Sequence, residues 1–183
     1  GYRGAYGVAN IKNAYVDPDS GKLRLKPGDY RWNYQELTDD IYNDHLNGTK
    51  SIGIQPCNEE GETKFGLIDI DPGNYENFDK KFIIDKIQEY KLPLIPILSK
   101  SKGIHLYIFM RKFIDAATLK SFLSNLLPLF RLKSDTEIFP KQTQLTKDLE
   151  KGGYRPGQFI NLPYFNKTER RALNIDGTEF TFE

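Results

Sequence analysis

The chain has 183 residues, of which 38% are hydrophobic and 13% aromatic, and its formal net charge is +1. This length suffices for one domain with a real core, while the charge excludes a protein that grips duplex DNA through many phosphates. The single cysteine, Cys57, excludes a disulfide and a CxxC zinc site, and no apolar run approaches the ~20 residues of a membrane span.

These totals favour a cytoplasmic protein with no zinc site and no membrane partner. Because the chain begins at a glycine, we expect it to be excised from something longer. The first fifty residues look irregular, with one hairpin predicted over VDPDSGKLRL (16–25). A helix is predicted over 34–48, where Gly48 ends it, and a short strand over 51–56.

The centre of the chain has clearer periodicity. Apolar residues at helical spacing predict helices over 76–90 and 115–127, the second capped by Asp115. Strands are predicted before, between and after these helices, over 64–71, 93–98, 104–110 and 136–139. The order β-α-β-β-α-β is typical of the ferredoxin-like or RRM-like arrangement, with both helices on one sheet face and the other face free. Two later segments, 157–165 and 179–182, look extended.

The fold class predicted from this order is α+β. We expect an N-terminal α/β subdomain over about 1–63, a ferredoxin/RRM-like unit over about 64–165 and a C-terminal extension over 166–183, all within one domain.

The stretch GLIDIDP (66–72) places two aspartates in an apolar strand, where unpaired carboxylates are costly. Strand side chains alternate between faces, so Asp69 and Asp71 point away from Ile68 and Ile70. The same alternation puts His105 and Glu137 opposite the aliphatic residues of their strands. We therefore expect Asp69, Asp71, Glu137 and His105 on one face, where carboxylate oxygens suit two Mg²⁺ or Mn²⁺ ions.

The loop LSKSKGIH (98–105) has the composition of a phosphate-binding loop. It offers hydroxyl and amide donors, two lysines and a glycine that permits close approach: Ser99, Ser101, Lys100, Lys102 and Gly103. It is not a Walker A loop, because GxxxxGK[ST] is absent. His105, at its end, has the right chemistry to donate to a triphosphate; the alternative is a histidine satisfied within the structure. Other basic stretches are 22–26 and Arg170-Arg171.

Three ordered motifs resemble those of the archaeo-eukaryotic primase superfamily. GLIDID matches its DxD strand, SKSKGIH its phosphate motif, and TEIFPKQ the strand with the last metal carboxylate. The segments HLNGTKSIGIQP and GQFINLPYF resemble the branch that includes TOTE conflict-system primases and CRISPR-associated primase-polymerases. The resemblance covers roughly residues 37–165 and implies the primase fold, with the β-α-β-β-α-β unit as its palm.

The resemblance implies roles for individual residues. The metal ligands and catalytic residues would be Asp69, Asp71 and Glu137, with Asp135 as an alternative third ligand. The nucleotide-binding residues would be Ser99, Ser101, Lys102, His105, Lys141, Gln142 and Asn161. For a second nucleotide or the template, only Arg170 and Arg171 stand out as basic candidates.

We therefore predict a DNA primase/polymerase, a template-dependent nucleotidyltransferase that makes primers de novo and extends them. Its partners would be nucleoside triphosphates, single-stranded DNA template and primer-template. One alternative is a metal-dependent nuclease or phosphodiesterase, because an acidic metal cluster also serves hydrolysis. The other is a non-catalytic RRM-like module that stacks bases on exposed aromatics, for which Tyr107 and Phe109 are candidates.

Overall fold

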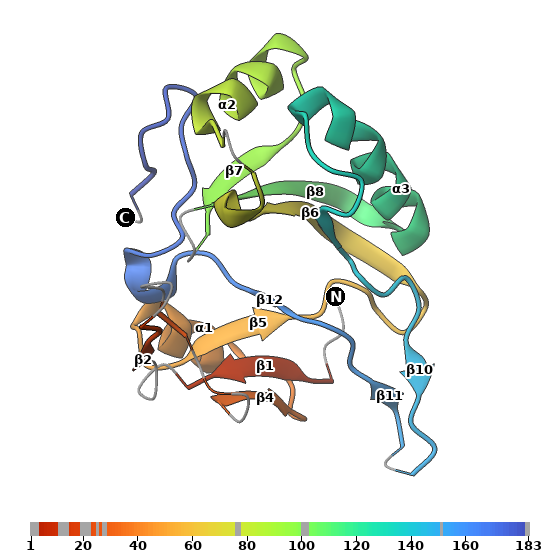
Figure 1. Ribbon diagram of the computed structural model, residues 1–183. Helices are drawn as coiled ribbons and strands as arrows, with labels where there is room; N and C mark the ends of the chain where they lie inside the picture. The colour runs from red at the N-terminus through yellow and green to blue at the C-terminus, as the bar shows by residue number, and fades with distance from the viewer. Residues whose placement is uncertain are drawn as a thin grey trace.

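The computed structural model describes residues 4–10, 15–18, 23–24, 26, 29–75, 78–99, 103–150 and 152–181. The chain forms a mixed α+β structure with two antiparallel four-stranded sheets that face one another (Figure 1). Helices cover the outer face of one sheet, so that helices, second sheet and first sheet follow in layers (Figure 1).

The second sheet is built by the central part of the chain. Along the sequence its elements are β6 (Glu62–Ile70), α2 (Lys80–Glu89), β7 (Ile95–Leu98), β8 (Ile104–Asp115), α3 (Ala116–Leu126) and β9 (Glu137–Phe139). The strands lie in the order β7-β8-β6-β9, and each neighbouring pair is antiparallel. This is the strand-helix-strand-strand-helix-strand order predicted from periodicity.

Capping explains where the two helices begin. The Asp79 carboxylate accepts a hydrogen bond from the Lys81 amide at 2.9 Å, so α2 starts four residues later than predicted. The Asp115 carboxylate accepts from the Thr118 amide at 2.6 Å, which confirms the predicted cap of α3. The 3-10 turn η4 (Leu127–Phe130), with Pro128, follows α3 directly.

The main core lies between the second sheet and its helices. Alternate strand residues and the inner faces of α2 and α3 supply it: Ile68, Ile70, Ile104, Leu106, Ile108, Ile138, Ile83, Ile84, Leu119 and Leu123. The predicted alternation of the β6, β8 and β9 strands is therefore confirmed.

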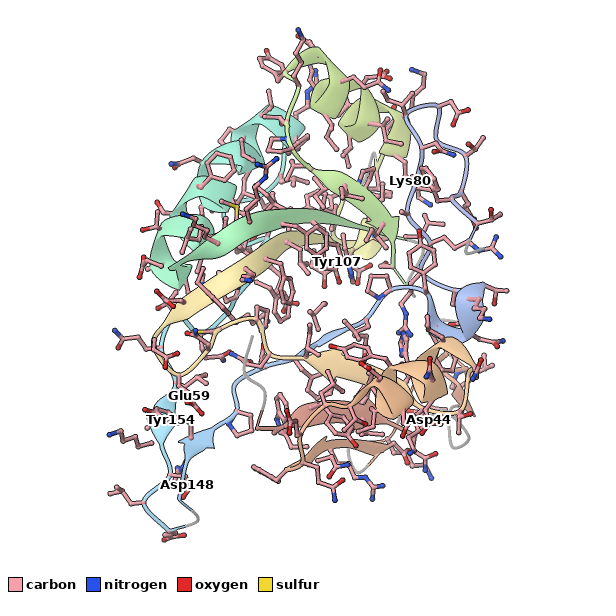
Figure 2. The ribbon with its side chains drawn as sticks, turned by 180° about the vertical axis from the view of Figure 1, so that it is seen from behind. Asp44, Glu59, Lys80, Tyr107, Asp148 and Tyr154 are labelled. Carbon is pink, nitrogen blue, oxygen red and sulfur yellow. The ribbon has the colours of Figure 1, made fainter. Side chains whose placement is uncertain are left out.

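The other face of the second sheet is not free, which corrects the prediction. A second apolar cluster covers its middle, formed by Phe65, Leu67, Ile97, Tyr107, Phe139, Ile160 and Ala172. Figure 2 shows Tyr107 between the two sheets, where it is only 2% exposed. The residues that alternate with the aliphatic set are themselves largely apolar, so the first sheet packs against them.

The first sheet has the order β12-β5-β1-β4. Its strands are β1 (Tyr6–Ala9), β4 (Tyr30–Asn33), β5 (Ser51–Ile54) and β12 (Ile160–Asn161). The first fifty residues are thus less irregular than predicted, because β1 pairs with both β4 and β5. Helix α1 (Asp39–Leu46) packs on β5 and is shorter than the predicted 34–48.

Two small hairpins complete the structure. The pairing of β2 (Tyr15–Val16) with β3 (Leu23–Arg24) agrees with the predicted hairpin, whose connecting residues 19–22 lie outside the described part. The pair β10 (Thr146–Lys147) and β11 (Tyr154–Arg155) projects from the body (Figure 1). In the described part of the 179–182 segment, Glu179 forms an isolated bridge with Leu173 and the Phe180 amide donates to the Ala172 carbonyl at 2.7 Å. Among the described residues, no helix has the length and apolarity needed to cross a membrane.

Candidate active site

Three of the predicted site residues lie side by side on adjacent strands. Asp69 of β6 is in register with His105 of β8 on one side and with Glu137 of β9 on the other. Directly opposed residues of antiparallel strands project their side chains to the same face. The His105 Nε2 atom lies 3.2 Å from the Asp69 Oδ1 atom, which couples the histidine to the central carboxylate.

Asp71 follows β6 and turns the chain into η3 (Pro72–Asn74). Its Oδ1 atom accepts a hydrogen bond from the Gly73 amide at 3.1 Å. Beside it is a pocket of about 330 Å³, here called the acidic pocket, lined by Asp69, Asp71, Asn74, Tyr75, Lys133, Asp135, Thr136 and Glu137. Four carboxylates face one lysine around this space, so their mutual repulsion favours binding of a cation.

Glu137 forms an ion pair with Lys141, four residues later in the chain. The Lys141 Nζ atom donates to the Glu137 Oε1 atom, and the Lys120 Nζ atom donates to the Lys141 carbonyl at 2.7 Å. Within the described ranges, no three His, Cys, Asp or Glu side chains converge closely enough to hold a metal ion. The expected metal carboxylates are therefore neighbours around one pocket, but they do not form a ready-made ligand cluster.

The donor chemistry of this pocket nevertheless fits a hard divalent cation. All four acidic side chains offer carboxylate oxygens, the ligands that Mg²⁺ and Mn²⁺ prefer. The Glu137 side chain is 47% exposed. It therefore has room to turn from Lys141 toward the pocket.

The predicted phosphate loop is closed at its base. The Ser99 amide donates to the Gly103 carbonyl at 3.0 Å, and the Gly103 amide donates to the Ser99 hydroxyl at 2.9 Å. Lys100, Ser101 and Lys102 lie outside the described residues. Gly103 packs against the end of β6, because a Cβ there would overlap the Ile70 carbonyl oxygen. This packing against β6 requires glycine at position 103. The sequence indicated a different reason for the glycine, the close approach of a phosphate.

The remaining predicted nucleotide-pocket residues separate in space. Lys141 lies beside the acidic pocket through its contact with Glu137. Gln142 instead accepts a hydrogen bond from the Gln158 amide at 2.9 Å. Asn161 lies on β12 opposite Gly53, and its buried Oδ1 atom has no hydrogen-bond partner among the described residues. Neither Gln142 nor Asn161 lines the acidic pocket.

The two arginines are not exposed cations of the acidic pocket. Arg170 is 7% exposed, its Nη2 atom donates to the Ser51 hydroxyl at 3.1 Å, and its guanidinium lies over the Phe165 ring. This burial lowers the pKa of Arg170 below its ordinary value. The Arg171 Nη1 atom pairs with Glu179 at 3.2 Å. Arg170 therefore links the segment that contains Phe165 to β5 of the first sheet.

The structure adds pocket residues that sequence reasoning missed. Tyr75 and Thr136 close one wall, with their hydroxyl oxygens 2.6 Å apart. The Lys133 Nζ atom lies over the Tyr75 ring, 5.5 Å from its centre, and brings a positive charge to the pocket. These three residues lie close in sequence to Asp71 and Asp135, which is the one feature of the sequence that could have identified them. Single polar residues in loops form no periodic pattern, so this feature was too weak for a prediction.

A comparison with known protein families found a match over most of the chain. The family described as "TOTE conflict system, Archaeo-Eukaryotic Primase domain" matches residues 10–178. A search among curated proteins found no significant match. The matched range contains all the residues that line the acidic pocket.

Proposed function

The chain belongs to the archaeo-eukaryotic primase domain family of TOTE conflict systems, a primase-like nucleotidyltransferase family, and we propose that it is a template-dependent DNA primase-polymerase. In this proposal it joins nucleotides into a primer de novo and then extends that primer. The substrates are nucleoside triphosphates, a single-stranded DNA template and a primer-template.

The observation that carries this proposal is the row Glu137, Asp69, His105 across three adjacent strands. It places two carboxylates beside a histidine that borders the base of the Ser99–Gly103 loop. A nucleotidyltransferase needs this combination, because the carboxylates serve the reacting phosphate while donors hold the rest of the triphosphate. We propose that the second sheet with α2 and α3 is the RRM-like palm, and that the first sheet is the additional N-terminal subdomain.

Archaeo-eukaryotic primase domains are generally metal-dependent. Here Asp69, Asp71 and Glu137 would hold two Mg²⁺ or Mn²⁺ ions, and Asp135 is the further carboxylate at the same pocket. When bound, such ions activate a 3′-oxygen and stabilise charge on the phosphoryl oxygens.

The chain's own groups then have separate tasks. Asp69 keeps His105 oriented through the 3.2 Å contact, so that one imidazole nitrogen stays directed at the carboxylate face. Lys133 supplies a charge able to neutralise a phosphate oxygen at the pocket. The two Ser99–Gly103 hydrogen bonds close the base of the loop, and Gly103 packs against the Ile70 carbonyl at the end of β6.

A strand-synthesis assay, in which the chain is incubated with a labelled primer-template, tests the proposal. With triphosphates and Mn²⁺ the wild-type chain should lengthen the primer, and the double variant Asp69→Ala/Asp71→Ala should not. The control is Asp85→Ala, which removes an exposed carboxylate that pairs with Lys81 on α2 and should leave synthesis unchanged. Robust synthesis by the double variant would refute this assignment of the site, and shortening of the strand would establish the nuclease alternative instead.

De novo initiation needs a second assay, because an extending enzyme holds its primer by the duplex whereas a primase holds two free nucleotides. We expect dinucleotides from unprimed template and labelled triphosphates, with more product in Mn²⁺, which tolerates irregular geometry better than Mg²⁺. Because initiation has no duplex to position the first nucleotide, its product should fall more with added salt than extension of a pre-annealed primer does. Extension without any dinucleotide would restrict the function to polymerisation.

A further inference from the structure

We propose that the exposed end of β8, remote from the acidic pocket, is a docking surface for the single-stranded DNA template, centred on Phe109. This inference rests on the proposed function for the identity of the strand, and it adds a binding surface that is separate from the acidic pocket.

A ladder of rings runs along β8 from the acidic pocket to this surface. The His105 ring lies 6.0 Å from the Tyr107 ring, and Tyr107 stacks on Phe109 at 5.7 Å with an interplanar angle of 8°. Phe65 of β6 lies beside both, 6.3 Å from Tyr107 and 6.2 Å from Phe109. Phe109 lies four residues beyond His105 on this strand, about 14 Å along the chain.

The ladder changes from buried to exposed along its length. His105 is 8% exposed and Tyr107 is 2% exposed, whereas Phe109 is 57% exposed. The apolar cluster between the sheets thus ends at Phe109, whose ring already rests on Tyr107 and Phe65 and keeps its remaining surface open. A rigid, half-exposed aromatic ring offers a stacking surface at little entropic cost.

Basic side chains follow Phe109 along β8 and lie on the neighbouring strand β6. Arg111 and Lys112 are exposed on β8, and the Lys64 Nζ atom lies 4.9 Å from the centre of the half-exposed Phe113 ring. The nearby Asp115 carboxylate is already occupied by the Thr118 amide and hydroxyl. Aromatic rings among basic side chains are the arrangement that binds single strands, by stacking of bases and neutralisation of phosphates.

The pairing of β6 with β8 is irregular next to Phe109. Phe65 pairs with Phe109, but Thr63 pairs with Ile114, so four residues of β8 oppose one residue of β6. Such a bulge bends a strand and redirects its side chains. Arg111 and Phe113 lie within this bulge. The low net charge of the chain also favours a partner held by stacking, because phosphate contacts alone would bind weakly.

Fluorescence anisotropy with a labelled single-stranded oligodeoxynucleotide, without metal or triphosphate, tests the surface. Phe109→Ala should raise the dissociation constant between about fivefold and a hundredfold, the range that one stacked base represents, while Phe109→Trp should preserve binding. The control is Phe122→Ala, which removes a 40% exposed phenylalanine on α3 and should bind as the wild type does. Arg111→Ala should reduce the salt slope by roughly 0.7 if it neutralises one phosphate of a single strand.

Parallel readouts separate this inference from the proposed function. Asp69→Ala/Asp71→Ala should bind the oligonucleotide while losing synthesis, and Phe109→Ala should need more template for half-maximal synthesis. Unchanged oligonucleotide affinity for a folded Phe109→Ala variant would overturn the inference even if synthesis persists. A change of its oligomeric state in size-exclusion chromatography, with affinity unchanged, would also overturn it and assign the surface to contacts between copies. Loss of affinity without any synthesis by the wild type would retain the docking surface and refute the polymerase.

Discussion

Replacing Gly103 by alanine should disturb the site through packing alone. A Cβ at this position would overlap the Ile70 carbonyl oxygen and come within 2.8 Å of Pro72 Cδ and 3.0 Å of Ser99 Oγ. The overlapped atom is backbone and belongs to the residue between Asp69 and Asp71. The extra methyl group therefore has to push the loop base away from the end of β6.

The cost has two parts. Overpacking of a close contact costs about 1–3 kcal/mol. Displacement of the loop weakens the two hydrogen bonds between Ser99 and Gly103, each worth about 1 kcal/mol. We therefore expect a loss of about 2–4 kcal/mol in the free energy of unfolding. For a chain of this size, that corresponds to a fall in Tm of roughly 5–15 °C.

Urea unfolding and primer extension measure the two consequences. Nucleotide addition should fall further than the stability loss suggests, because a shift of about 1 Å in a reacting group can cost a hundredfold in rate. The matched control is Gly152→Ala, in the turn between β10 and β11, where no atom lies within 4 Å but φ is +69°. It should lose only about 1 kcal/mol from backbone strain. A Gly103→Ala variant with wild-type stability and activity would refute the packing argument.

Two further changes address the two histidines. His105→Ala should weaken triphosphate binding by about 1.5–3 kcal/mol in titration calorimetry with Mn²⁺, the scale of a hydrogen bond to a charged group; unchanged affinity with reduced stability would make His105 a packing residue only. The His45 Nε2 atom donates to the Pro163 carbonyl at 2.9 Å, and its Nδ1 atom accepts from the Ile52 amide at 3.2 Å. Burial lowers the pKa of His45. The contribution of His45 to the free energy of unfolding should therefore be complete above the ordinary pKa of about 6.5 and decline as the pH falls below it. Urea unfolding across pH 5.5–8 should show this decline in the wild type and less of it in His45→Gln, and an equal decline in both would contradict the assignment.

Much of the second sheet could be predicted because its signals are local. The alternation in β6 and β8 and the capping aspartates Asp79 and Asp115 each act within a few residues. Strand parity then sufficed to bring Asp69, His105 and Glu137 to one face, without knowledge of the strand order.

The first sheet could not be predicted in the same way. β1 and β4 have four residues each and are held by partners more than twenty positions away. Short strands of this kind gain their stability from long-range pairing, which leaves little periodicity in the sequence. The burial of the inner face of the second sheet, by contrast, could have been predicted. Leu67, Tyr107 and Phe139 share a face with the carboxylate row, and apolar residues on that face have to pack against another part of the chain.

The two sheets together explain how a carboxylate row can persist next to an apolar layer. Across the second sheet, Leu67 and Tyr107 are covered by the first sheet, whereas Asp69 keeps a partly exposed side chain one pleat farther along β6. The apolar layer therefore stops where the carboxylates begin, and they remain open on the side of the acidic pocket. Because water is excluded on one side of Asp69 and admitted on the other, a cation that enters the acidic pocket would meet carboxylates that a packed core holds in place.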